Sequence, residues 1–81
     1  MFTLYIIYSK SLDCYYVGYT NSIERRISEH NRKKKKFTDK GIPWNLVYLE
    51  NYMTKKEAMD REKFIKSKKS KNFILELIAQ R

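Results

Sequence analysis

Five side chains of types that can transfer protons, hold a cation or stabilise negative charge stand out in this sequence. They are two phenols, a guanidinium, an imidazole and a carboxylate: Tyr5, Tyr16, Arg26, His30 and Glu62. Hydrolysis of a phosphodiester needs such parts, because a carboxylate and water hold a hard cation, a base activates the nucleophile and a positive group stabilises charge on the phosphate. The five must face one another to do this, so the elements that carry them come next.

The two tyrosines lie on predicted strands. Residues 2–8 and 14–19 are short apolar runs rich in β-branched and aromatic residues, which is typical of the two strands of a hairpin. Side chains alternate between the two faces of a strand, so Leu4 and Ile6 lie on one face of the first strand and Tyr5 lies on the other.

The register of this hairpin decides whether the tyrosines meet. Pairing of Tyr8 with Asp13 across a four-residue loop would set Tyr5 directly opposite Tyr16. Opposed residues have Cβ atoms about 4.5–5.5 Å apart, so the two hydroxyls would converge on one spot. The alternative is that both are ordinary core or rim tyrosines, since the chain has seven tyrosines.

A helix is predicted over about 21–32. Asn21 is its expected N-cap, with an acidic residue, Glu24, three positions later. The i, i+3, i+4, i+7 positions of its inner stripe are Ile23, Arg26, Ile27 and His30. Arg26 and His30 are therefore expected to flank the core-facing side. Taken singly, each also fits a structural role, as a snorkelling arginine or as a histidine on a helix face.

The second half of the chain supplies a third strand over about 44–50 and a third helix. In that strand, alternation places Trp44, Leu46 and Tyr48 on one face. The third helix is expected to begin after Ser70, and its apolar stripe would close the core.

A second helix, over about 54–68, carries the fifth candidate. Thr54 and Glu57 have the spacing of a capping box, which predicts where this helix begins. Glu62 falls between two apolar core positions, where a carboxylate is costly unless it is paired or binds a metal. The alternative is a surface salt bridge to Lys66 at i, i+4.

Together these elements predict an α/β (α+β) fold, with a three-stranded antiparallel sheet flanked by three helices in the order β-β-α-β-α-α. The 81 residues suit one domain over 1–81. A single cysteine, Cys14, excludes a disulfide framework and, with one histidine, argues against structural zinc. No apolar run approaches the roughly 18 residues of a membrane span and no signal peptide is visible, so a cytoplasmic protein is expected.

The charge of the chain favours a polyanionic partner. Eighteen Lys and Arg against nine Asp and Glu give +9. Nucleic acid is favoured over a membrane surface, because no segment combines a basic face with an apolar face that the core does not need. The residues assigned to nucleic-acid contact are Gly18, Arg25, Arg32, Lys33, Lys34, Lys35, Lys36, Lys66, Lys68 and Lys69. For the run at 32–36, the alternative is solvated charge in a loop, and the two readings are compatible.

Four stretches carry a family resemblance. They are Thr3-Leu4-Tyr5, Tyr16-Val17-Gly18, the run from Glu24 to His30, and Arg61-Glu62-Lys63. In this order they resemble the GIY-YIG nuclease domain over about residues 2–66, and the chain is most similar to its small stand-alone bacterial members. Thr3 stands where the family has its first glycine. The asparagine that some members carry late in the domain has no clear match, Asn72 being the only late candidate.

The resemblance implies an endonuclease that hydrolyses DNA by a one-metal mechanism, in a family with a role in DNA repair. It implies that Glu62 holds Mg²⁺ or Mn²⁺, that Arg26 contacts the scissile phosphate, and that His30 transfers a proton or positions the phosphate. Either Tyr5 or Tyr16 would be the general base, and a protein partner could supply targeting. The alternative is a nucleic-acid-binding module with this fold and little or no catalytic activity; a protein-interaction domain ranks third.

Overall fold

The computed structural model describes residues 1–34 and 37–80 of the chain. Its elements follow the predicted order, with a short 3-10 helix added before the third strand. They are β1 (Phe2–Ser9), β2 (Cys14–Thr20), α1 (Ile23–His30), the 3-10 helix Phe37–Gly41, β3 (Trp44–Tyr52), α2 (Lys55–Ser67) and α3 (Lys71–Ala79). The predicted α+β architecture is therefore confirmed.

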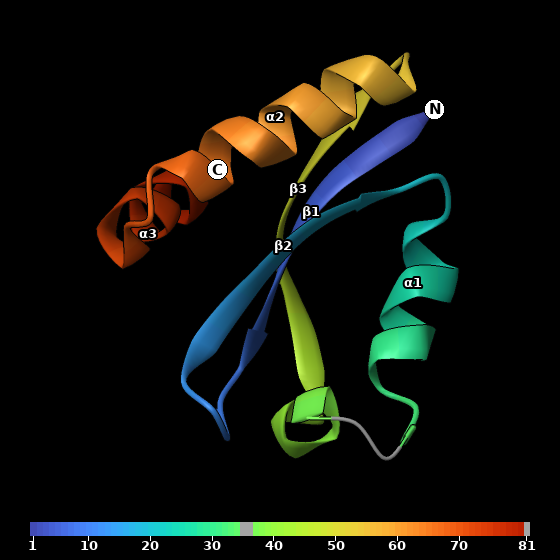
Figure 1. The fold of residues 1–81 in the computed structure, drawn as a ribbon, viewed down its shortest axis with the longest axis vertical. Helices are drawn as coiled ribbons and strands as arrows, with labels where there is room; N and C mark the ends of the chain where they lie inside the picture. The colour runs from blue at the N-terminus through green and yellow to red at the C-terminus, as the bar shows by residue number, and fades with distance from the viewer. Residues whose placement is uncertain (35–36, 81) are drawn as a thin grey trace.

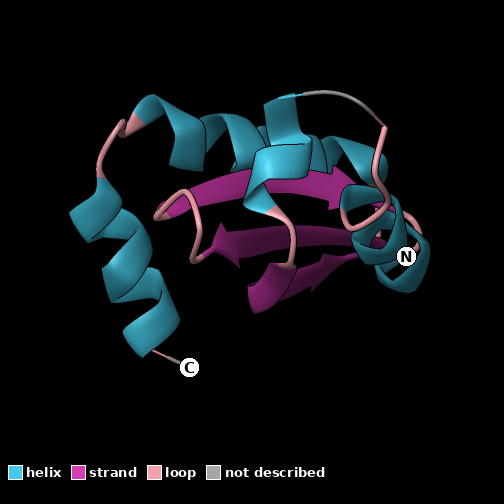
Figure 2. Ribbon diagram, turned by 90° about the horizontal axis from the view of Figure 1, so that it is seen from below, coloured by secondary structure: helices cyan, strands magenta, loops and turns pink. Residues whose placement is uncertain are grey.

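The sheet is antiparallel with the order β2-β1-β3, so β1 is the central strand and β2 lies at one edge. Helix α1 covers one face of the sheet, and α2 and α3 cover the other (Figure 1). Figure 2 shows the three strands side by side as one layer. Because the face of a β1 residue determines which helix it meets, alternation along this strand sorts its side chains between two different environments.

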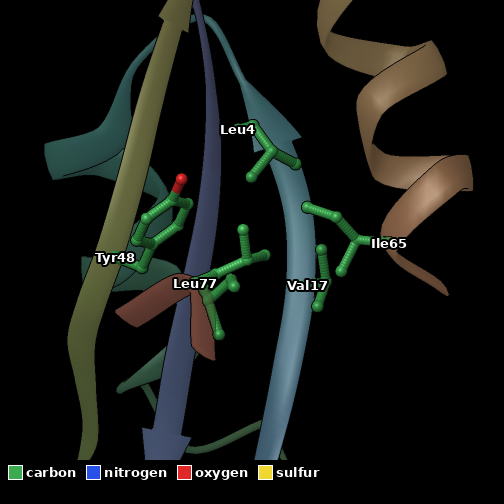
Figure 3. Close-up of a cluster of buried hydrophobic side chains, with 6 residues drawn as sticks. Leu4, Val17, Tyr48, Ile65 and Leu77 are labelled. Carbon is green, nitrogen blue, oxygen red and sulfur yellow. The ribbon is translucent and has the colours of Figure 1, made fainter. Parts of the chain in front are cut away.

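The larger apolar cluster lies between the sheet and the helices α2 and α3. Its buried members alternate along the strands and meet one residue from each helix (Figure 3): Leu4, Ile6, Val17, Tyr48, Ile65 and Leu77. The opposite face buries a smaller cluster of Tyr5, Ile7 and Trp44, against which Ile23 and Ile27 of α1 pack. The predicted assignment of Leu4 and Ile6 to one face of β1 and of Tyr5 to the other is confirmed by these two clusters.

The predicted register of the hairpin was wrong by two residues. Pairing continues to Ser9 and Cys14, so that Tyr5 lies opposite Gly18 and Tyr16 lies opposite Ile7. The chain reverses over the four residues after Ser9, the last of which is an aspartate, Asp13, in the left-handed region with φ of 48°. Aspartate tolerates that conformation better than most residues, and its carboxylate here accepts a hydrogen bond from the Tyr8 hydroxyl at 2.7 Å. A shift by an even number leaves every side chain on its predicted face.

Strand β3 contains an irregularity that alternation did not predict. Ile6 pairs with Tyr48 but Ile7 pairs with Leu46, so Val47 is an extra residue, as in a β-bulge. Tyr48 consequently packs in the cluster below α2 and α3, whereas Trp44 packs in the cluster below α1. The prediction that Trp44, Leu46 and Tyr48 share one face was therefore wrong.

The helix ends follow the expected chemistry in two of three cases. The capping box of α2 is present, with the backbone N–H of Glu57 donating to the Thr54 hydroxyl at 3.2 Å, and Ser70 caps α3. Helix α1 differs, because its N-cap is Ser22 and it ends at His30. Asn21 was therefore the wrong cap, and its side chain accepts instead from Arg25 at 2.9 Å. None of the helices in the described part of the chain has the length and apolar character that crossing a bilayer requires.

Candidate active site

Tyr5 is the centre of the candidate site. Its side chain is only 1% exposed and lies across Gly18, its partner on the edge strand β2. A Cβ atom at Gly18 would come within 2.6 Å of the Tyr5 hydroxyl oxygen and 2.8 Å of its Cζ. The absence of a side chain at this position is thus what lets the phenol ring lie flat against the strand.

The inner stripe of α1 delivers two polar side chains to the Tyr5 hydroxyl. Arg26 Nε donates a hydrogen bond to the hydroxyl oxygen at 3.2 Å, and His30 Nε2 lies 3.0 Å from the same oxygen. The guanidinium can only donate, whereas a neutral imidazole nitrogen can accept. The arrangement therefore forms a chain in which Arg26 donates to Tyr5 and Tyr5 donates to His30.

The ionisation of these groups favours that direction. Burial raises the pKa of Tyr5, with the charges of Tyr16 and Glu62 adding to it and Arg26 opposing it. Burial also lowers the pKa of His30, helped by the positive charges of Arg26 and Lys34. At neutral pH the phenol keeps its proton and the imidazole is neutral, which is the protonation pattern that the hydrogen-bond chain needs.

Arg26 keeps donor capacity beyond this chain. A guanidinium has five N–H donors; one is used on Tyr5 and another, on Nη1, meets Glu29 Oε1 at 3.3 Å. The hydrogen bond with Tyr5 raises the pKa of Arg26, although partial burial opposes the shift. Arg26 is therefore a permanent positive charge that borders the site, in a geometry suited to bidentate contact with an oxyanion.

Tyr16 contacts the other side of His30. Their ring centroids are 5.0 Å apart in an edge-on arrangement, while the Tyr5 and His30 centroids are 6.0 Å apart. Both tyrosines thus flank the same imidazole, as their shared face requires. The direct pairing of Tyr5 with Tyr16, from which convergence of the two hydroxyls was predicted, is wrong, since Tyr16 lies opposite Ile7.

Sequence reasoning missed two residues that lie next to this group of rings. Trp44 lies 6.4 Å from the rings of both Tyr16 and His30. Asn31, just after α1, clamps it, because its amide donates to the Trp44 carbonyl at 3.1 Å and accepts from the Trp44 N–H at 2.6 Å. Only the bulge in β3 brings Trp44 to this face, and alternation could not reveal it.

Glu62 reaches the same edge from α2. Its side chain is 18% exposed and lies 3.7 Å from Lys66 Nζ, so the predicted i, i+4 pair is present. Burial is the main cause of the raised pKa of Tyr5, and the negative charge of Glu62 adds the smallest contribution to it. Lys66 Nζ also lies 5.8 Å from the centre of the Tyr16 ring.

The donor set is compatible with one type of metal site. In residues 1–34 and 37–80, no three or more histidine, cysteine or acidic side chains gather as a ready-made cage. Mg²⁺ is commonly held by one or two carboxylates together with waters and substrate phosphates. A single, mostly buried carboxylate at the edge of a basic protein, as at Glu62, suits that mode and does not suit zinc.

The predicted nucleic-acid residues fall into three groups. Gly18 is buried beneath Tyr5. The exposed members are Arg25, Arg32, Lys33 and Lys34 on or just after α1, and Lys66, Lys68 and Lys69 at the end of α2. Lys35 and Lys36 lie outside the described residues. Arg32, predicted as helical, follows the end of α1.

Two hollows extend from the site along the edge strand. One, of about 730 Å³, is lined by Tyr19 and by the cations Arg25, Arg26 and Lys55. The other, of about 250 Å³, is lined by Tyr16, Lys66 and Lys69. Cationic side chains therefore border both ends of the candidate site, as a polyanion that follows the β2 edge would require.

Comparison with known proteins identifies relatives of similar size. The UPF0213 protein of Streptococcus pneumoniae serotype 4 is 39% identical over 67 residues, which is 76% of this chain and 68% of the relative. That of Clostridium perfringens is 39% identical over 79 residues, covering 96% and 83%. That of Bacillus licheniformis is 45% identical over 58 residues, which is 70% of this chain but 60% of the relative. These names state no activity.

No solved structure matches the chain at a significant level. The family model described as the GIY-YIG catalytic domain matches residues 1–74. This span contains all five candidate residues, from Tyr5 on β1 to Glu62 on α2. The chain therefore belongs to the GIY-YIG family.

Proposed function

We propose that this protein, as one domain over 1–81, is an endonuclease that hydrolyses DNA phosphodiester bonds with a single Mg²⁺ or Mn²⁺. Membership of a catalytic-domain family suggests a nuclease. The observation that carries the proposal is the hydrogen-bond chain from Arg26 through Tyr5 to His30, because it holds a guanidinium and an imidazole together next to the ring of Tyr16, which Lys66 of α2 also approaches. Structural packing alone does not require that combination.

Each side chain has a role that follows from its contacts. Arg26 binds the scissile phosphate and stabilises its developing charge. Tyr5 is buried and its hydroxyl is engaged by both Arg26 and His30, so it holds these two side chains and is not free to meet the attacking water. Because Nε2 of His30 accepts from Tyr5, its remaining ring N–H can donate to the phosphate. We therefore assign the general base to Tyr16.

Glu62 would hold the metal, which, when bound, neutralises charge on the phosphate and polarises its oxygens. Lysines and arginines at both ends of the site would bind the DNA backbone without reading sequence. No feature of the described residues selects a base sequence, so a protein partner is the expected source of targeting.

Cleavage assays test the proposal. Single-stranded, nicked, flapped and duplex DNA are incubated with Mg²⁺ and the wild type, Glu62→Gln or Tyr16→Phe. We expect wild-type cleavage and a loss of at least about 100-fold in either variant, with binding retained. If the wild type binds with a steep salt dependence but cuts nothing, the chain is a binding module with a nuclease fold. If Glu62→Gln cleaves DNA as fast as the wild type, the assignment of the metal to Glu62 is wrong.

A further inference from the structure

Lys66 lies between two groups of the candidate site. Its ammonium is 3.7 Å from Glu62 Oε2, one turn earlier on α2, and 5.8 Å from the ring centre of Tyr16 on β2. It also lines the hollow of about 250 Å³ beside Tyr16. The side chain is 51% exposed, whereas Glu62 is 18% exposed. Lys66 thus covers the solvent side of the one carboxylate to which we assign the metal.

The contact with Tyr16 separates this ion pair from an ordinary helix salt bridge. Lys56 and Asp60 form such a bridge on the same helix at 2.8 Å, with both partners well exposed to solvent. Lys66 instead bridges two elements, because it pairs within α2 and stacks over an aromatic ring of the sheet. Lys66 therefore lies next to a residue of the site as well as next to a residue of its own helix.

Lysine is suited to leave this position. Its ammonium is a strongly hydrated point charge on a flexible stem of four carbons. A partly exposed i, i+4 pair of this kind contributes little to stability, so a divalent cation can displace the lysine at little cost. Both cations cannot remain at full contact with one carboxylate, because they repel each other over a few ångströms.

We propose that Lys66 is the resident counter-ion of Glu62 and exchanges with the metal. Without metal, Lys66 neutralises the carboxylate and keeps it at the site edge. When metal binds, the ammonium is released beside Tyr16, where it binds a phosphate of the substrate. Metal binding and nucleic-acid binding therefore favour each other through one lysine. This inference rests on the proposed function, since it takes Glu62 as the metal ligand.

The first test measures metal binding without DNA. Free Mn²⁺ is titrated by electron paramagnetic resonance in the presence of the wild type, Lys66→Met, Lys63→Met or Glu62→Gln. Lys63→Met is the matched control, because it removes the same charge from an exposed site next to Glu62 in sequence. We expect Lys66→Met to bind Mn²⁺ about 2-fold more tightly than the wild type, because the competing ion pair is weak, and Lys63→Met to bind it as the wild type does.

The outcomes separate this inference from the proposed function. Equal Mn²⁺ affinities for Lys66→Met and Lys63→Met, with binding lost in Glu62→Gln, would overturn the exchange role of Lys66 alone. Unchanged binding by Glu62→Gln would overturn the metal assignment as well. Loss of binding in Glu62→Gln with tighter binding in Lys66→Met supports both.

The second test measures DNA affinity with and without Ca²⁺, a divalent cation used here in place of Mg²⁺ to limit cleavage. Without Ca²⁺, Lys66→Met and Lys63→Met should lose affinity equally, since each removes one positive charge from the surface. With Ca²⁺, Lys66→Met should lose about 3-fold more than Lys63→Met, because only Lys66 is released onto the substrate. Equal losses under both conditions would refute the released state.

Discussion

Two polar clusters that each contain arginine and tyrosine lie on opposite faces of the sheet. Under α1, Arg26 and His30 bind the hydroxyl of Tyr5. Under α2, the carboxylate of Glu50 is the acceptor. Arg61 donates to it twice, from Nε to Oε1 at 3.0 Å and from Nη2 to Oε2 at 3.2 Å. The hydroxyls of Tyr52, at 2.6 Å, and of Tyr48 also donate to it. The presence of tyrosine and arginine alone therefore does not distinguish an active site from a cluster that only stabilises the fold.

The group at the centre makes the difference. Glu50 is a charged acceptor that receives four hydrogen bonds, so the charge of Arg61 is compensated where it is bound. Burial opposes ionisation of Glu50, but Arg61, Tyr48 and Tyr52 outweigh it and lower its pKa, while burial and Glu50 together raise the pKa of Tyr52 to about 12. Such a cluster is complete and joins β3 to α2.

The cluster under α1 has a neutral phenol at its centre instead. The Tyr5 hydroxyl cannot compensate the charge of Arg26, and Glu29 reaches that arginine only at 3.3 Å near the surface. Arg26 therefore keeps N–H donors for an incoming anion, and its charge is paired only with Glu29 in a partly exposed i, i+3 ion pair. A carboxylate at the centre of a polar cluster neutralises the arginine that binds it, whereas a neutral phenol leaves the arginine available to bind an anion.

Replacing the two arginines in turn should have the largest effects, on the cleavage rate in one case and on stability in the other. Arg26→Ala should lower the cleavage rate by about 10²- to 10³-fold, as loss of a transition-state donor does, with a melting temperature close to that of the wild type. Arg61→Ala should lower the free energy of unfolding by about 2 kcal/mol, because Glu50 would lose its charged partner, and leave the rate per folded molecule nearly unchanged. Thermal melts and single-turnover cleavage measure both.

The reverse pattern would contradict the distinction between the two clusters. A melting temperature that falls as far in Arg26→Ala as in Arg61→Ala would make the cluster under α1 a structural one. Retention of full cleavage by Arg26→Ala would remove that arginine from the chemistry.

A methyl group at Gly18 should have the next largest effect. In Gly18→Ala, the Cβ would lie within 3 Å of the hydroxyl oxygen and the Cζ of the buried Tyr5, so this side chain or the edge strand must move. Forcing extra volume into a packed site costs about 1–3 kcal/mol in the free energy of unfolding. The displaced atom is the hydroxyl that binds Arg26 and His30. The cleavage rate per folded molecule should therefore fall as well, beyond what the loss of stability explains. Urea unfolding and cleavage at a temperature where the variant is folded separate the two losses.

Tyr5→Phe in the Gly18→Ala background sharpens this prediction. Phenylalanine lacks the oxygen that comes closest to the added methyl group, so the double variant should recover part of the lost stability without recovering cleavage. Absence of any recovery would place the clash elsewhere.

The sequence predicts the faces of this fold better than its pairings. Alternation assigns Tyr5 and Tyr16 to the face of α1, and the helical period brings Arg26 and His30 there too, because both patterns depend only on local geometry. The pairing of Tyr5 with Gly18 depends on the shape of the turn at Asp13. That shape is a balance of backbone conformations that alternation does not record.

The bulge is the second feature outside local rules. One extra residue in β3 moves Trp44 to the site and leaves Tyr48 in the core on the other face. Val47 carries no residue-type signal for a bulge, such as glycine. Likewise the sequence does not predict the partner of Arg61, the carboxylate of Glu50, and only the structure contrasts it with Arg26, which binds a phenol.

The smallest expected effect is on the pH dependence of stability, because the two clusters take up protons in different ranges as pH falls. The pKa of His30 in the folded protein lies below its ordinary value of 6.5, so the unfolded chain binds this proton more readily. Stability from His30 is therefore complete above pH 6.5 and falls as pH decreases toward the folded pKa. The lowered pKa of Glu50 acts further down, since its contribution is complete above its ordinary value of 4.5 and is lost below it.

Unfolding by urea at several pH values from 7.5 to 4 resolves the two ranges. Between pH 7.5 and 5, stability should decline slightly in the wild type and in Glu50→Gln but not in His30→Gln, which has no imidazole to protonate. Below pH 4.5, the decline should be shallower in Glu50→Gln than in the wild type, the remainder coming from other carboxylates with lowered pKa such as Glu29. A decline above pH 5 that persists in His30→Gln would mean that the neutral imidazole is not what the site under α1 requires.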